Sequence, residues 1–267
     1  MYKIVFVDID GTLIKKDQTV SPETVTTVQR LLAKGIPVIL VSARQPDAMS
    51  AVSQMIGTTS QPIVSMNGSF ILMDNQPVFQ SVIDLDWVRR LHGHSPEEGS
   101  GLVYYVQREW SAESPSKWTE YEQKKTPVEI RIDTFRNLLQ DWSVAQTAPN
   151  KIMYMGEEVF VQELQKKLSH SFGDLLNIYP SKPTYLEITK KDASKENAIR
   201  FLIERMGIDR SEVIAIGDNF NDYEMIRYAG LGVAMGNAPQ EVRQIADLVT
   251  DTNEQDGVRK VLDKLIP

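Results

Sequence analysis

The sequence predicts an α/β protein, with a doubly wound parallel sheet whose chain is interrupted by an inserted α+β domain. Short, fully apolar strands alternate with amphipathic helices over residues 1–82 and again over residues 189–267. The intervening residues 83–188 contain all four tryptophans and all three histidines, and their strand candidates mix polar with apolar side chains. We therefore expect residues 1–82 and 189–267 to share one domain and residues 83–188 to form another.

The first core segment is predicted to run strand, helix, strand, helix, strand. Each of its helices begins with a capping signal, Ser21-Pro22 in the first and Pro46-Asp47 in the second. The strands are residues 4–7, 38–41 and 63–66. Helices between parallel strands are right-handed crossovers, so this order indicates a Rossmann-like core.

In the insertion the predicted strands mix polar with apolar residues, and after it the chain returns to apolar strands alternating with helices. Within the insertion we expect strands at 102–107, 151–155 and 185–188 and a helix at 157–168, with one face of the sheet wet. The second core segment is predicted to begin with a helix after Ser194 and a buried strand at 213–216. Further helices then alternate with short strands at 232–235 and 248–249.

Composition excludes several classes of function. A formal net charge of −7 and a pI near 5.1 argue against nucleic acid or an anionic membrane as the main partner. The absence of cysteine excludes thiolate nucleophiles, disulfides and cysteine-bound zinc. No run of about 18 apolar residues occurs, so we expect a soluble, cytoplasmic protein. The oligomeric state stays open.

Carboxylates follow two of the predicted buried strands. Asp8 and Asp10 close the first strand in the pattern D-x-D-G-T, and Asp218 and Asp222 follow strand 213–216 in the pattern G-D-x-x-N-D. If both strands share a sheet, the four acids converge, and their mutual repulsion favours a hard cation such as Mg²⁺. Taken alone, D-x-D is more often a solvated acidic turn after a strand, whereas G-D-x-x-N-D is as often a helix cap as a functional site.

Together, the two patterns resemble motifs one and four of the haloacid dehalogenase (HAD) superfamily of phosphohydrolases. Ser42, at the end of strand 38–41, matches the hydroxyl residue of motif two, and Lys195 matches the lysine of motif three. Ser42 replaces the more usual threonine, which keeps the hydroxyl. Glu196 follows Lys195 where glycine is usual, which leaves the local backbone and charge less defined.

The resemblance implies roles for these residues. Asp8 would be the nucleophile that forms an aspartyl-phosphate, and Asp10 the general acid and base. Asp8, the Asp10 backbone carbonyl and Asp218 would hold Mg²⁺, and Asp222 would support its shell. Phosphate-binding groups would be Ser42, Lys195 and Asn221. Residues at neighbouring strand ends, Arg44, Asn67 and Gly68, are expected to contact the substrate.

The position of the insertion, between motifs two and three, resembles the Cof-type subgroup with its C2 cap. This implies a Mg²⁺-dependent phosphatase of small phosphorylated metabolites, most often sugar phosphates, with residues 83–188 as a substrate-selecting cap. Two alternatives remain open from the sequence. One is a phosphomutase on the same scaffold, and the other is a non-hydrolytic phosphorylation switch or binding protein.

Overall fold

The structure, a computed structural model, describes residues 1–94, 100–124 and 126–267. It divides into two compact units. Unit 1 comprises residues 1–44, 49–78 and 194–267, and unit 2 comprises residues 45–48 and 79–193. The assignment of residues 83–188 as a cap remains a prediction. No helix in the described ranges combines the length and the apolar character needed to cross a membrane.

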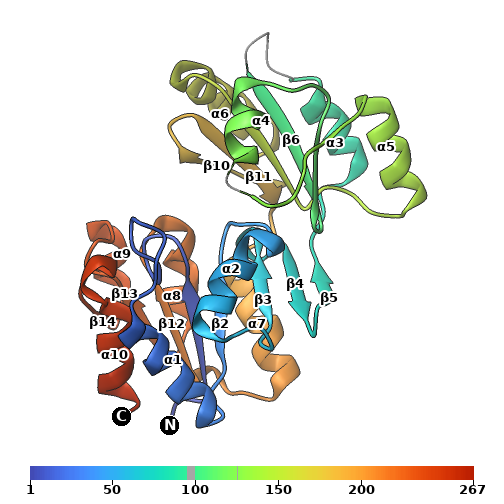
Figure 1. Ribbon diagram of the computed structural model, residues 1–267. Helices are drawn as coiled ribbons and strands as arrows, with labels where there is room; N and C mark the ends of the chain where they lie inside the picture. Colours follow the sequence, from blue (N-terminus) through green and yellow to red (C-terminus); the bar gives the residue numbers. More distant parts are fainter. Residues whose placement is uncertain (95–99, 125) are drawn as a thin grey trace. The chain divides into compact units, whose positions relative to one another are not determined.

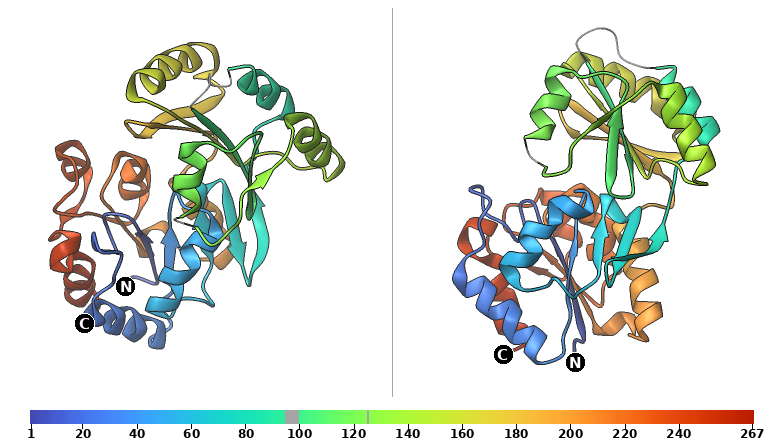
Figure 2. Two further views of the ribbon diagram at one scale, coloured as in Figure 1. Left: turned by 45° about the horizontal axis from the view of Figure 1, so that its top comes forward. Right: turned by 45° about the vertical axis from the view of Figure 1, so that its right-hand side comes forward.

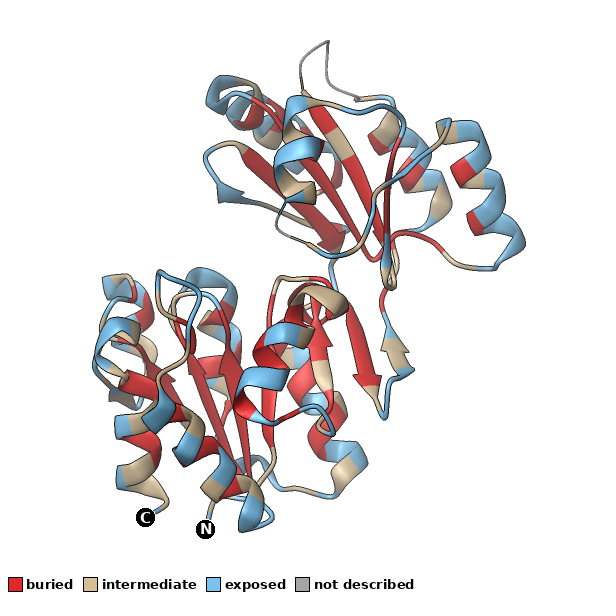
Figure 3. Ribbon diagram, viewed as in Figure 1, coloured by how far each residue is buried: buried red, intermediate tan, exposed pale blue. Residues whose placement is uncertain are grey.

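In the described residues, unit 1 is built on an eight-stranded sheet with β1 near its centre (Figure 1). The strand order is β14-β13-β12-β1-β2-β3-β4-β5, and the pairings from β14 through to β3 are parallel. Its strands are β1 (Ile4–Asp8), β2 (Val38–Val41), β3 (Ile63–Ser65), β4 (Phe70–Met73), β5 (Gln76–Gln80), β12 (Val213–Gly217), β13 (Leu231–Ala234) and β14 (Leu248–Val249). Every residue of β1, β2 and β12 is buried, as their uninterrupted apolar sequences require (Figure 3).

Helices cover both faces of this sheet (Figure 2). Apolar side chains of α1 (Pro22–Ala33), α2 (Pro46–Ile56) and α10 (Gly257–Leu265) pack with alternate residues of β1, such as Val5 and Val7. The opposite face is covered by α7 (Lys195–Met206) and α8 (Tyr223–Tyr228). A short helix, α9 (Gln240–Ile245), precedes β14. The predicted α/β fold with a doubly wound parallel core is confirmed.

Unit 2 is an α+β layer with its own core. Its sheet has the order β10-β11-β9-β6-β7-β8, and helices α3, α5 and α6 pack on one face. The strands are β6 (Gly101–Val106), β7 (Glu109–Ala112), β8 (Arg131–Ile132), β9 (Lys151–Met155), β10 (Leu176–Lys182) and β11 (Tyr185–Lys190). The helices are α3 (Leu85–His92), α4 (Lys117–Gln123), α5 (Phe135–Val144) and α6 (Glu158–Phe172).

The other face of the unit 2 sheet carries polar and aromatic side chains. Lys151 and Glu187 form a buried ion pair there, with 3.3 Å between Nζ and Oε2. The Lys151 ammonium also lies 4.5 Å from the centre of the Tyr105 ring, and the Tyr179 hydroxyl donates to Glu187. We predicted that this face would be exposed to solvent. At Lys151 and Glu187 that prediction is wrong, because neighbouring side chains bury both charged groups.

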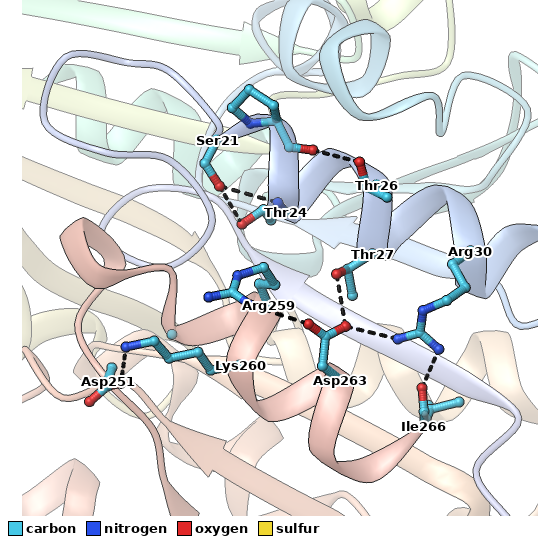
Figure 4. Close-up of polar contacts among 12 residues, drawn as sticks. Ser21, Thr24, Thr26, Thr27, Arg30, Asp251, Arg259, Lys260, Asp263 and Ile266 are labelled. Carbon is cyan, nitrogen blue, oxygen red and sulfur yellow. Dashed lines mark hydrogen bonds and ion pairs between the residues drawn. The ribbon is translucent and has the colours of Figure 1, made fainter.

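A polar contact fastens the last helix to the first (Figure 4). Asp263 of α10 accepts hydrogen bonds from Thr27 Oγ1 and Arg30 Nη2 of α1, both at 2.9 Å. Arg259 lies on the same side of α10 and pairs with Asp263 at 3.4 Å. Ser21 caps the amino end of α1, because its Oγ accepts a hydrogen bond from the Thr24 amide at 3.2 Å. The contact joins residues more than 230 positions apart in the sequence, so it links the first and last helices of unit 1.

We expect Asp263→Asn to lower the free energy of unfolding by about 1 kcal/mol, because it weakens one hydrogen bond and two partly exposed ion pairs. Urea denaturation measures the change. The matched control is Lys264→Gln, an exposed neighbour in the same helix, which should change stability by no more than about 0.5 kcal/mol. Equal effects of the two variants would contradict a role for the Asp263 contact.

Candidate active site

The candidate site lies at the carboxyl ends of β1 and β12, which are neighbours in the sheet. Val7 pairs with Ile216, so Asp8 and Gly217 end the two strands at the same level. The strand order reverses here, since the chain continues from β1 to β2 on one side and from β12 to β13 on the other. Such a switch point is where open α/β sheets place their ligands.

Three carboxylates converge at this point. Asp8, Asp218 and Asp222 each offer an oxygen, and these oxygens lie within 4.8 Å of one another. Asp8 is 5% exposed and Asp222 is fully buried. Burial raises the pKa of Asp8 above its ordinary value, and the ammonium of Lys195 opposes this rise.

Lys195 supplies the cation inside the cluster. Its side chain is 1% exposed, and its Nζ donates to Asp8 Oδ1 (2.5 Å) and to Asp222 Oδ1. Burial alone would lower the pKa of Lys195, but Asp222 and Asp8 raise it above the ordinary value. Lys195 is therefore protonated at neutral pH. Its position is set by α7, whose first turn is capped by Ser194.

Asp222 is held by the loop that it closes. Its Oδ2 accepts hydrogen bonds from the backbone amides of Asp218 (2.9 Å) and Asn219 (3.0 Å), while its Oδ1 receives Lys195. Both oxygens are therefore engaged by protein donors. Asp222 orients the Asp218 loop and the lysine, and this arrangement suits a supporting position behind a metal site.

Asp218 is the least neutralised acid of the three. It accepts a hydrogen bond from Thr12 Oγ1 at 2.8 Å, and Asn237 Nδ2 lies 3.4 Å from its other oxygen. Burial and the neighbouring Asp222 raise the pKa of Asp218 to about 6. Gly11 is essential for this approach, because a Cβ at residue 11 would stand 2.4 Å from Asp218 Oδ2.

Asp10 has a different environment from Asp8. Its two oxygens accept from Arg44 Nε (2.8 Å) and Arg44 Nη2 (2.6 Å), and its side chain is 54% exposed. The sequence predicted that four carboxylates would converge. Instead, β1 ends at Asp8, and the following turn directs Asp10 towards Arg44.

The remaining predicted residues lie on loops around the cluster. Ser42 is buried, and its Oγ accepts from the Arg44 amide at 3.1 Å. The Asn67 amide donates to the Ser42 carbonyl, and the Asn67 side chain accepts from Asn221 Nδ2 at 3.0 Å. These contacts bring Asn67 and Asn221 together from β3 and β12, although their side chains bind each other in this state.

Gly68 has a structural requirement of its own. A Cβ at this position would lie 2.2 Å from the Ser194 carbonyl oxygen, and φ is +91°. The loop can therefore approach the start of α7 only with glycine at residue 68. The departure at Glu196 is also accommodated, because Glu196 lies in the first turn of α7 and pairs with Arg200 at 2.6 Å.

Two residues of the site were not predicted. Thr12 holds Asp218, and Asn237 donates to the Gly11 carbonyl at 2.9 Å as well as lying near Asp218. Thr12 was visible as the last letter of D-x-D-G-T, but nothing in the pattern indicated that its hydroxyl binds a distant acid. Asn237 follows β13 as a single polar residue, a signal too weak to distinguish from a turn.

The donor set fits a divalent cation. The three carboxylates and the one ammonium carry a formal charge of −2, and all the candidate ligand atoms are oxygens. Hard cations such as Mg²⁺ prefer this chemistry. Burial first, and then the negative charge of Asp222, raise the pKa of Asp218 within this cluster.

Comparisons with known proteins agree with this architecture. A family model described as "haloacid dehalogenase-like hydrolase" matches residues 5–262. A Haemophilus influenzae protein named "Putative phosphatase" is 37% identical, covering 100% of this chain and 99% of its own. The 5-amino-6-(5-phospho-D-ribitylamino)uracil phosphatase YcsE of Bacillus subtilis is 30% identical, covering 97% of this chain and 94% of its own.

A solved structure shows the same fold. The haloacid dehalogenase-like hydrolase from Bacteroides thetaiotaomicron superposes with a TM-score of 0.87 at 27% identity, covering 100% of both chains. The family predicted from the sequence motifs is confirmed. This chain belongs to the haloacid dehalogenase-like hydrolase family, and it is an enzyme of the phosphoric monoester hydrolase class.

Proposed function

We propose that this protein is a Mg²⁺-dependent phosphatase that hydrolyses small phosphorylated metabolites through an aspartyl-phosphate on Asp8. The observation that carries the proposal is the position of Asp8 at the carboxyl end of β1. There its carboxylate contacts a buried ammonium and lies beside two further acids. A carboxylate held beside a cation needs no separate base to act as a nucleophile.

In the first step, an oxygen of Asp8 attacks the phosphorus atom, and the bond from phosphorus to the leaving oxygen breaks. Asp10 donates a proton to that oxygen, so the alcohol leaves uncharged. In the second step, Asp10 takes a proton from water, and the resulting oxygen attacks the same phosphorus. The bond to Asp8 breaks, which releases phosphate and restores the carboxylate.

The transferring phosphoryl group carries negative charge that nearby donors would stabilise. We assign this role to Lys195, Ser42 and Asn221, which lie around the strand ends. Asn67 and Gly68 would face the substrate from the loop after β3. Arg44 was expected to do the same, and its guanidinium contacts Asp10.

Mg²⁺ would be held by Asp8, Asp218 and the backbone carbonyl of Asp10, with Asp222 in support. When bound, it supplies positive charge that offsets the repulsion between the acids and the phosphate. The protein contributes the orientation of these ligands. Thr12 and Asn237 bind Asp218, and the amides of residues 218 and 219 bind Asp222.

For the substrate, we propose a phosphorylated sugar or a related polyol, selected by residues 83–188 as the cap. The Bacillus subtilis relative supports this class, because its name specifies a phosphorylated ribityl compound. Phosphate release from a panel of sugar phosphates, sugar-alcohol phosphates, nucleotides and pyridoxal phosphate, with Mg²⁺ present, would test the proposal. Turnover confined to nucleotides or pyridoxal phosphate would overturn the substrate class.

Asp8→Asn should abolish turnover and leave the fold intact, because the amide keeps the shape but cannot attack phosphorus. We expect a loss of at least about 10³-fold in kcat. Phosphate release and thermal unfolding are measured side by side on this variant. Residual activity within tenfold of the natural protein would contradict Asp8 as the nucleophile.

Activity should require a divalent metal. Excess EDTA is expected to reduce phosphate release to background, and added Mg²⁺ should restore it. Ca²⁺ should support little turnover, because its larger and looser coordination shell misplaces the nucleophile relative to the phosphate. Undiminished activity in excess EDTA would remove the metal from the proposal.

Asp218→Asn should stabilise the metal-free protein at pH 8. The pKa of Asp218 is about 6 in the folded state and near 3.8 when the chain is unfolded, so the folded protein binds this proton more tightly. The resulting penalty appears as pH rises from about 4 to 6 and is complete above that. The gain in thermal midpoint should therefore be largest at pH 8 and vanish near pH 4.

The same variant gives the opposite result with metal. Mg²⁺ should raise the thermal midpoint of the natural protein at pH 8 and have a smaller effect on Asp218→Asn, because a ligand has been lost. Glu224→Gln, an exposed acid in α8, serves as the matched control. If Mg²⁺ raised the thermal midpoints of the natural protein and of Asp218→Asn equally, Asp218 would be excluded as a ligand.

A further inference from the structure

The contact between Arg44 and Asp10 has the geometry of a fork. Arg44 donates from Nε and from Nη2, one nitrogen to each oxygen of the Asp10 carboxylate, at 2.8 and 2.6 Å. Two parallel hydrogen bonds between planar groups fix the plane of the carboxylate as well as its distance. A lysine could supply the charge but not this orientation.

Arg44 is itself anchored on three sides. Its amide donates to Ser42 Oγ at 3.1 Å, and its carbonyl accepts from the Met66 amide at 2.9 Å. Its Nη2 also donates to Gln18 Oε1 at 2.8 Å. The guanidinium therefore links the loop after β2 to the turn that contains Gln18, with Asp10 between them.

The Gln18 turn is well defined. The Lys15 amide donates to the Thr19 carbonyl at 2.9 Å, and the Gln18 amide donates to the Lys15 carbonyl at 3.0 Å. Gln18 has a φ of 65°, which glutamine rarely adopts. Such a conformation persists only when its surroundings support it, and here the side chain meets the guanidinium.

Asp10 needs an external restraint more than Asp8 does. Its side chain is 54% exposed, whereas that of Asp8 is 7% exposed and contacts Lys195. An exposed carboxylate on a turn has several rotamers within reach, and only some of them direct an oxygen at a leaving group. The arginine fork removes that freedom.

We propose that Arg44 is a positioning residue for Asp10, and that Gln18 braces the guanidinium in turn. This inference rests on the proposed function, in which Asp10 is the general acid and base. Arg44 then acts through Asp10, so its loss slows proton transfer in both steps. The alternative is that Arg44 contacts the substrate, in which case its loss raises KM.

The first experiment compares leaving groups for Arg44→Gln. With a sugar phosphate of the panel, whose alkoxide is a poor leaving group, we expect kcat to fall by about 10- to 100-fold. Formation of the phosphoenzyme from p-nitrophenyl phosphate, followed in single turnover, should fall by less than about threefold, because nitrophenolate leaves without a proton. Equal losses on both substrates, or a change confined to KM, would overturn the positioning role.

The second experiment measures the lifetime of the phosphoenzyme, which depends on Asp10 as a base. Arg44→Gln should lengthen this lifetime, and Asp10→Asn should lengthen it further. The double variant should match Asp10→Asn, because Arg44 has nothing left to position. Multiplicative effects of the two changes would show that Arg44 acts independently of Asp10.

Two milder variants keep the test decisive if Arg44→Gln folds poorly. Arg44→Lys retains the charge without the fork, so most of the leaving-group effect should remain. Gln18→Ala removes only the brace and should give a smaller effect of the same kind. Full activity of Arg44→Lys on the sugar phosphate would overturn the proposal. If the natural protein releases no phosphate, or Asp8→Asn retains activity, the proposed function itself has failed.

Discussion

The structure of the site depends on one buried ammonium. Lys195 is almost wholly enclosed, and an isolated charge in that position would cost several kcal/mol. Hydrogen bonds to Asp8 and Asp222 offset the cost, and they join β1, α7 and the loop after β12 at a single point. Removing either acid would leave a buried charge partly unpaired. The ion pairs that partly neutralise the acids therefore also hold the three segments in register.

Close backbone approach is the second condition for this cluster. The turn after β1 passes so near Asp218 that residue 11 has no room for a side chain, and residue 217 is equally restricted by Asp222, at 2.5 Å from a would-be Cβ. Gly11 is thus required by Asp218, an acid of the other motif, and Gly217 by Asp222, an acid of its own motif. In both motifs a glycine leaves the space that a nearby carboxylate occupies.

Much of this arrangement follows from the sequence, and the exceptions have physical causes. The buried strands and capped helices of unit 1 were predictable because short, fully apolar runs alternate with amphipathic segments that begin at residues such as Ser21-Pro22. The hairpin of β4 and β5 was not predicted. Its turn is formed by Asp74 and Asn75, two residue types that tolerate the positive φ both adopt here. Its second strand is half exposed and carries glutamines, so neither periodicity nor composition marks it. Lys195 shows the limit most clearly: read alone it would be a surface lysine, and only the family motifs indicated otherwise.

The two aspartates of D-x-D-G-T show how two like residues acquire different chemistry. Asp8 belongs to the strand, is buried, and meets a compact ammonium that acts as a point charge. Asp10 lies two residues later on a solvent-facing turn and meets a planar guanidinium that imposes a direction. In the proposed function Asp8 is the nucleophile, which needs a fixed position and charge compensation, and burial beside Lys195 suits both needs. A group that must give and take protons needs access and orientation, which the second environment provides. The roles that we propose for the two acids therefore rest on their different partners, since their side chains are identical.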